Sequence, residues 1–192
     1  MPANTPIKVC SRALLLIGAE GISSFQDGTA ESDVADAMYE DVTRTALTNT
    51  RWRFATKQAV LNRLSAAPTG RFDAAYQLPG DFLMVNAVTV SDFPIQYDIY
   101  NNRVFCNESD NAEVIADYIF RANESDWPAY FTLAVEYAMA AVFATSIARD
   151  AQLTQMMEQK AQFHMMQARR LDSQQQTTRR LYTSRFITQR LS

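Results

Sequence analysis

The sequence predicts an α+β fold, namely a four-helix bundle with an inserted small antiparallel β-sheet and an extended C-terminal tail. Apolar residues recur at helical spacing towards both ends of the chain. In the middle, short β-branched and aromatic runs separated by turn residues replace that spacing. Arginines then gather at the C-terminal end. We therefore expect a discontinuous bundle formed by residues 1–51 and 122–172, an inserted β region at 52–121 and a docking tail at 173–192.

The first helix has clear boundaries in the sequence. Thr5 is a capping residue, Pro6 suits the first helical position, and Gly18 ends the run from Ile7 to Ile17. The last four residues of that run, Leu14–Ile17, are apolar on every side. We expect this end of the helix to be buried.

A second helix is expected from about Ala30 to Thr48, after a loop. At 100° per residue its apolar face is formed by Val34, Ala35, Met38, Tyr39, Val42 and Ala46. The opposite face carries Asp33, Asp36, Glu40 and Arg44. This division indicates an amphipathic helix at the surface of the bundle.

The β region contains three predicted stretches. Phe82–Val90 is an apolar run, and Val114–Arg121 alternates as a half-buried strand does. Tyr97–Cys106 is expected to form a hairpin, because Asn101 and Asn102 tolerate the positive φ values of a two-residue turn. These stretches predict the inserted antiparallel sheet.

Two more helices follow. Asp126 and Pro128 predict the start of the third, which should reach about Ala148, and Asp150 is expected to cap the fourth. The segment Ala129–Ala148 is long and apolar, but it is rich in alanine and contains an acid, so a buried helix is expected rather than a membrane span. The predicted buried face of the fourth helix contains Leu153, Met156, Met157, His164, Ala168 and Leu171.

Residues suited to catalysis or metal binding are few. The single histidine, His164, falls on an apolar helix face, and Cys10 and Cys106 have no metal-ligand spacing with it. The chain has no GxSxG, P-loop, GxGxxG or HExxH motif. Carboxylate pairs such as Asp33 with Asp36, or Asp92 with Asp98, keep a glycan hydrolase open as an alternative. We expect no enzyme activity, no metal and no cofactor.

Three residues are candidates for a subunit interface. Methionines at 156, 157, 165 and 166 point to several sides of the fourth predicted helix, so one pair would be exposed in a monomer. Met165 and Met166 are the candidates from that group. Glu136 is the third, because it is the one acid in an otherwise apolar helix.

The tail differs in charge from the rest of the chain. Residues 160–192 hold seven cationic side chains and one aspartate, a net charge of +6, which leaves −9 on the rest and −3 overall. Such asymmetry is typical of an interaction tail. We expect the tail to dock on a partner through Arg179, Arg180, Leu181, Tyr182, Arg185, Phe186, Arg190 and Leu191. Binding of DNA through the same arginines is a further alternative.

Several stretches, in this order, resemble tail tubular protein A of short-tailed bacteriophages. They cover roughly residues 7–172 and comprise Arg12-Ala-Leu-Leu-Leu-Ile-Gly18, Ile22-Ser-Ser-Phe-Gln-Asp-Gly28, Tyr39-Glu-Asp, Trp52-Arg-Phe-Ala-Thr-Lys57, Leu78-Pro-Gly-Asp-Phe82, Asp117-Tyr-Ile-Phe-Arg121 and Trp127-Pro128. The resemblance implies a head-to-tail adaptor that forms a twelve-membered ring between the portal protein and the tail nozzle protein. Double-stranded DNA would pass through that ring without specific binding.

The resemblance also implies where the protein acts. It would be made in the cytoplasm of a host bacterium and end in the virion, at the head–tail junction, without contact with a membrane. The segment from about Asp172 to Ser192 would grip the portal. The N-terminal sequence agrees with a cytoplasmic origin, because it lacks the basic and apolar regions of a secretion signal.

Overall fold

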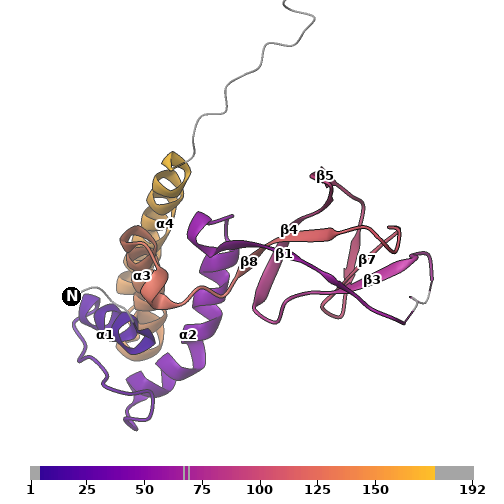
Figure 1. Ribbon diagram of the computed structural model, residues 1–192. Helices are drawn as coiled ribbons and strands as arrows, with labels where there is room; N and C mark the ends of the chain where they lie inside the picture. The colour runs from indigo at the N-terminus through magenta and orange to yellow at the C-terminus, as the bar shows by residue number, and fades with distance from the viewer. Residues whose placement is uncertain (1–4, 67, 69, 176–192) are drawn as a thin grey trace, which may run out of the picture.

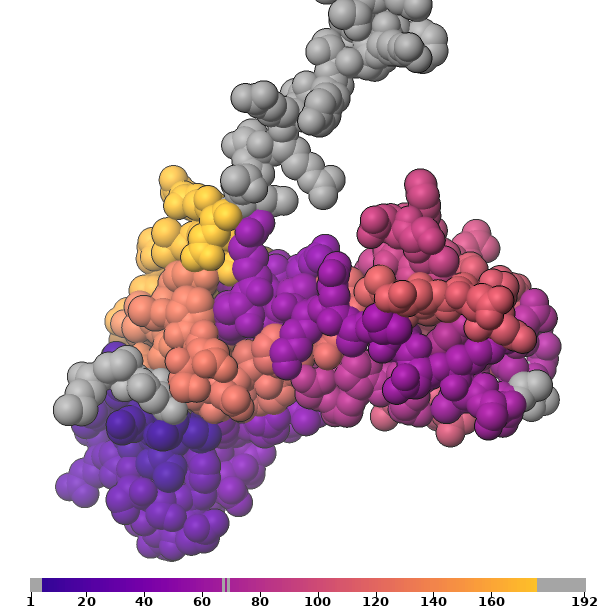
Figure 2. Space-filling view, viewed as in Figure 1, coloured from indigo at the N-terminus to yellow at the C-terminus, as the bar shows by residue number. Residues whose placement is uncertain are grey.

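The protein consists of two lobes joined side by side (Figure 1). The computed structural model describes residues 5–66, 68 and 70–175. Its helices form one lobe, and two four-stranded antiparallel sheets between residues 56 and 120 form the other. The space-filling view shows the same elongated outline, with the β-lobe projecting from the helical lobe (Figure 2).

The helical lobe is organised around its third helix. α3 contacts each of the other three α-helices, and α4 packs along its length and along the π-helical turn η3 that follows it. Two short 3₁₀ helices, η1 and η2, lie where the chain passes between the lobes, η1 before β1 and η2 after β8. The bounds are α1 Pro6–Leu16, α2 Ala30–Thr48, η1 Arg53–Ala55, η2 Glu124–Asp126, α3 Ala129–Phe143, η3 Ala144–Ala148 and α4 Ala151–Gln174.

Local side-chain capping fixes the starts of α1, α2 and α4, whereas the N-cap of α3 is Pro128, which makes no side-chain hydrogen bond. Thr5 accepts a hydrogen bond from the backbone of Lys8, and Asp150 accepts two from the first turn of α4. At α2, Thr29 and Ser32 form a reciprocal capping box. The predicted first, second and fourth helices are confirmed, and α2 has the predicted bounds. The third is also confirmed, although its last turn is η3 rather than α-helix.

The β-lobe contains two sheets of four strands. One has the order β1-β8-β4-β5 and the other β2-β3-β7-β6, and every pairing is antiparallel. The strands are β1 Thr56–Val60, β2 Asn62–Arg63, β3 Ala74–Gln77, β4 Phe82–Val90, β5 Phe93–Pro94, β6 Asp98–Tyr100, β7 Arg103–Cys106 and β8 Val114–Phe120. The predicted strands at β4 and β8 are confirmed. So is the hairpin of β6 and β7, in which Asn101 and Asn102 have φ values of 48° and 58°.

Each lobe has its own apolar core. In the β-lobe, buried side chains from both sheets pack together, including Tyr76 from β3, Val104 from β7 and Val88 from β4. The core of the helical lobe takes residues from all four α-helices and from the chain segments that enter it. β8 reaches both cores, because Tyr118 packs in the β-lobe and Ile119 packs among the helices.

The prediction of a four-helix bundle with a small inserted sheet is wrong. Over the described residues the fold is mixed α/β, with four α-helices and two four-stranded antiparallel sheets, so the β-lobe is a substantial body with a core of its own. The helices are gathered around α3 instead of lying as four mutual neighbours. The cause lies in α3, which is apolar on most sides and therefore needs cover from several directions. The predicted tail, 173–192, lies almost wholly outside the described residues, which end at 175.

Burial corrects two predicted helix faces. Leu14 is fully buried, but Leu15 is 64% exposed, so the end of α1 is only partly covered. In α4, Met157 and Ala168 are buried as expected, whereas Met156 and Leu171 are exposed. The buried side of α4 is thus narrower than the predicted apolar face.

Within the described part of the chain, one helical segment is long and apolar enough to cross a membrane. Ala129–Ala148 meets this criterion by length and composition, and half of it is buried inside the protein. It packs against α1, α2 and α4 through buried residues such as Phe131, Val135 and Phe143. The segment occupies the position of a core helix, the arrangement expected from the sequence.

Candidate interaction surfaces

The lone histidine is a packing residue. The ring of His164 stacks on Tyr137 of α3, with centroids 4.5 Å apart and planes 6° from parallel. Phe163 meets the same imidazole edge-on. The contact fastens α4 to α3 and holds the imidazole between two aromatic rings.

The carboxylates considered for glycan hydrolysis lie in ordinary surface positions. Asp33 and Asp36 are exposed on α2, and Asp92 lies in an exposed turn with a positive φ. Asp98 pairs with Arg71 and accepts a hydrogen bond from the hydroxyl of Tyr100. Within the described residues, no group of three or more His, Cys, Asp or Glu side chains is arranged to hold a metal ion.

Both cysteines are buried and free. Burial raises the pKa of the Cys10 thiol to about 12, and burial with the neighbouring Glu108 also raises the pKa of Cys106. A thiol held protonated is a weak nucleophile. The two cysteines therefore act as small apolar core residues.

Glu136 lies inside the helical lobe and is 2% exposed. Its Oε1 is 3.2 Å from Nη1 of Arg12, a half-exposed side chain of α1. The geometry of this ion pair does not make a hydrogen bond, so the buried oxygen has no hydrogen-bond partner among the described residues. Burial raises the pKa of Glu136, and the charge of Arg12 offsets part of the increase. The acid faces α1 within one chain and is inaccessible to a neighbouring subunit.

A polar network joins the two lobes. Arg121, which follows β8, donates three hydrogen bonds to Glu40 of α2 at 3.0–3.2 Å and one to Glu124 at 2.6 Å. The hydroxyl of Tyr39 donates to the same Glu124 oxygen at 2.8 Å. Charge-assisted bonds of this kind are short and strong. They fix the exit of β8 against α2.

Many of the residues that carry the resemblance stated above build this junction. The indole of Trp52 donates to the carbonyl of Ala46, and that of Trp127 donates to the carbonyl of Ala122. Both rings pack against Phe131 of α3, with centroids 5.1 and 5.0 Å away. These motif residues pack in the core of the helical lobe, at the points where the chain passes to and from the β-lobe.

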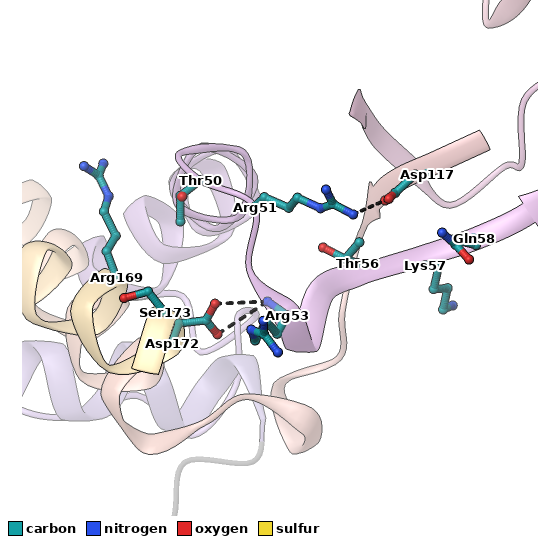
Figure 3. Close-up of a pocket in the computed structure, with 10 residues that line it drawn as sticks. All are labelled: Thr50, Arg51, Arg53, Thr56, Lys57, Gln58, Asp117, Arg169, Asp172 and Ser173. Carbon is teal, nitrogen blue, oxygen red and sulfur yellow. Dashed lines mark hydrogen bonds and ion pairs between the residues drawn. The ribbon is translucent and has the colours of Figure 1, made fainter. Parts of the chain in front are cut away.

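An open cleft of about 820 Å³ lies at the same junction, beside the end of α4 (Figure 3). Arg51 extends across it to pair with Asp117 of β8, and Asp172 accepts hydrogen bonds from the backbone of Arg53. Asp172 also accepts from the hydroxyl of Tyr130 at 2.9 Å; burial and this carboxylate together raise the pKa of that tyrosine to about 12. The cleft is lined by Thr50, Arg51, Arg53, Thr56, Lys57, Gln58, Asp117, Arg169, Asp172 and Ser173. It has more cations than acids and lies where the chain enters the C-terminal segment.

The clearest interaction surface is a second apolar face on α4. Met156, Phe163 and Met166 are 42%, 50% and 61% exposed, and at 100° per residue they lie within 80° of one another around the helix. We call these three residues the α4 stripe. The other side of α4 already packs against α3 through Met157 and Ala168. An exposed row of large apolar side chains indicates a contact with another molecule.

The predicted interface residues differ in their placement. Met166 belongs to the α4 stripe, whereas Met165 is half-buried against the helical core and Glu136 is enclosed. Periodicity assigned Met156 to the core, so the prediction missed it as an exposed partner of Met166. The predicted docking residues from Arg179 to Leu191 lie outside the described part of the chain.

Comparison of the sequence with models of known protein families finds no match, and no curated protein matches it significantly.

Proposed function

We propose that this protein is a structural virion component, a ring-forming adaptor that joins the portal to the tail nozzle of a short-tailed bacteriophage. The observation that carries the proposal is the α4 stripe, a second apolar face on a helix whose first face is already packed. A monomer would leave that surface in water, whereas a ring would cover it. The resemblance to tail tubular protein A supplies the kind of ring.

Two further features support an adaptor. The molecule is elongated, with a helical lobe at one end and a β-lobe at the other, so it has separate surfaces for two partners (Figure 1). The Arg121 network joins these lobes. Joined lobes suit a part that links two other components.

Charge agrees with a channel for DNA. All of the chain before residue 160 carries a net charge of −9. Acidic walls repel phosphates, so DNA would pass without being held. The basic C-terminal segment would dock on the portal through the residues named in the sequence analysis.

Imaging with the partner tests the proposal. Purified full-length protein would be mixed with portal rings of the same virion and examined by negative-stain microscopy and by mass. We expect a closed ring of this protein on each portal. A chain that remains monomeric at concentrations well above those in the cell, with portal present, contradicts the adaptor function.

The docking role of the tail has its own test. Deleting residues 176–192 leaves the contact of Arg53 with the carbonyl of Gln175 in place, so the truncated protein should keep the circular dichroism spectrum of the full chain. We expect its attachment to portal rings to weaken at least tenfold. Full attachment of the truncated protein would reject tail docking without affecting the ring.

A further inference from the structure

A shallow apolar groove lies between α2 and the C-terminal end of α3. It has a volume of about 570 Å³ and is lined by Val34, Ala37 and Met38 from α2 and Val142 from α3, with Thr145 of η3 at one end. Met38 is 39% exposed although its neighbours are apolar. The groove is therefore an unfilled apolar site on the helical lobe.

The two helices that carry these apolar surfaces have opposite charge. α2 contains five acidic residues and one arginine. Asp33 lines the groove, and Asp41 lies on the same side of α2 one turn beyond Met38; both are exposed. The groove is thus bordered by carboxylates at both ends of its apolar section.

The α4 stripe is bordered by cations. Lys160 and Arg170 are exposed and lie on the same side of α4 as Phe163 by helical spacing. Glu158 lies 140° from Phe163 and 80° from Met166 around the helix axis, outside the arc of 80° that the three stripe residues span. An apolar row with positive flanks therefore matches an apolar groove with negative flanks in both polarity and charge.

Within one molecule, the α4 stripe does not cover the α2–α3 groove. Met38 and Phe163 are both exposed in the same molecule, and α3 packs against α2 on one side and α4 on another. Two different surfaces that fit each other make a head-to-tail contact between copies. Such contacts close into a ring when the rotation between copies allows it.

We propose that the α4 stripe of one copy lies in the α2–α3 groove of the next copy, with Lys160 and Arg170 facing Asp33 and Asp41 across the contact. The proposal rests on the proposed function, because it names the interface of that ring. Each copy then uses its groove towards one neighbour and its stripe towards the other.

Charge reversal tests the pairing. One variant carries Asp33→Lys and Asp41→Lys, the other Lys160→Glu and Arg170→Glu, and all four side chains are exposed, so both variants should fold. Each would be mixed with portal rings, alone and together in equal amounts. We expect each variant alone to lose ring formation at least tenfold, and the equal mixture to regain it as alternating copies. Glu113→Lys is the matched control, because Glu113 is exposed on the β-lobe, outside both surfaces, and should leave ring formation unchanged.

The outcomes separate this inference from the proposed function. If the wild-type chain forms no ring with portal, the adaptor function itself fails. If the wild-type ring forms but either variant alone assembles normally, or the mixture does not recover, the stripe–groove contact is wrong and the adaptor stands. That result would leave the C-terminal segment or the portal as the occupant of the stripe.

A second measurement covers the case in which a reversal variant does not fold. A chain carrying Met38→Cys and Met166→Cys would be oxidised mildly after ring assembly. The native Cys10 and Cys106 are buried, so a ladder of linked chains would come from the new pair. A ladder supports the contact, and its absence from an assembled ring rejects it.

Discussion

Replacing Arg121 with methionine should destabilise the protein by weakening the junction between its lobes. The guanidinium is one-fifth exposed and bonds to Glu124, whose side chain is 11% exposed, and to Glu40, whose side chain is 47% exposed. A hydrogen bond to a charged group contributes about 1.5–3 kcal/mol. The exposed Glu40 pair adds little, so we expect a loss of about 2–3 kcal/mol, most of it from Glu124. For a chain of this length that lowers Tm by about 4–12 °C.

Urea unfolding followed by tryptophan fluorescence is a direct assay, because Trp52 and Trp127 are both buried at this junction. Arg103→Met is a suitable control, since Arg103 is exposed on the β-lobe and no described carboxylate pairs with it. A loss below about 0.5 kcal/mol, the range of ordinary surface changes, would refute the assigned role of the network.

The same variant has a predicted pH dependence. Partial burial raises the pKa of Glu40, but hydrogen bonds from Arg121 and Arg44 outweigh it, and the net pKa is lowered. A lowered pKa in the folded state gives stability that is present above the unfolded value and lost as pH falls through the folded value. The difference between wild type and Arg121→Met should therefore shrink as pH falls below about 4.

Three further changes have defined outcomes. Burial raises the pKa of Glu136 in the folded protein. The stability that comes from its protonated form is therefore present below the unfolded pKa and is lost as pH rises through the folded pKa. In urea titrations, Glu136→Gln should match wild type near pH 4 and be about 1 kcal/mol more stable than wild type at pH 7. Equal stability at both pH values would contradict this. Asp150→Ala removes the cap of α4 and should cost about 1 kcal/mol by the same titration, with Asp126→Ala, which caps no helix, as control. Asn102→Val places a β-branched residue at φ 58° and should cost about 1–2 kcal/mol, whereas Asn102→Gly should not.

Elements specified by neighbouring residues could be predicted from the sequence. The start of α2 follows from the capping box of Thr29 and Ser32, and the β6–β7 turn follows from two asparagines that accept positive φ. Both depend on contacts within a few residues. Such signals can be recognised in a short stretch of sequence, without knowing what packs against it.

Elements that depend on residues far away in the sequence could not be predicted. β1 contains Lys57 and Gln58, which have weak strand preference, and it is a strand because it pairs with β8 some sixty residues later. Likewise, the pattern of α3 shows that it is covered on several sides but not which elements cover it. Helices and strands could therefore be predicted from the sequence, whereas the arrangement of the helices and the size of the β-lobe could not.

Predictions for the candidate interaction surface also succeeded where neighbouring residues decide the outcome and failed where distant residues do. Periodicity found that the methionines of α4 point to several sides, but it assigned Met156 to the core and left Met165 as an interface candidate. The side that packs is decided by contacts with α3, where Tyr137 stacks on His164. Glu136 was singled out as a lone acid, and its partner, Arg12, lies in another helix far away in sequence.

The central place of α3 has a consequence for folding during synthesis. α3 begins at Ala129, so α1 and α2 leave the ribosome well before the helix that covers Val9, Leu14 and Leu47. The β-lobe is complete in sequence by Phe120 and has its own core. The β-lobe can therefore close first, while the first two helices still expose apolar side chains. The growing chain is most open to aggregation or chaperone binding in the interval before α3 emerges.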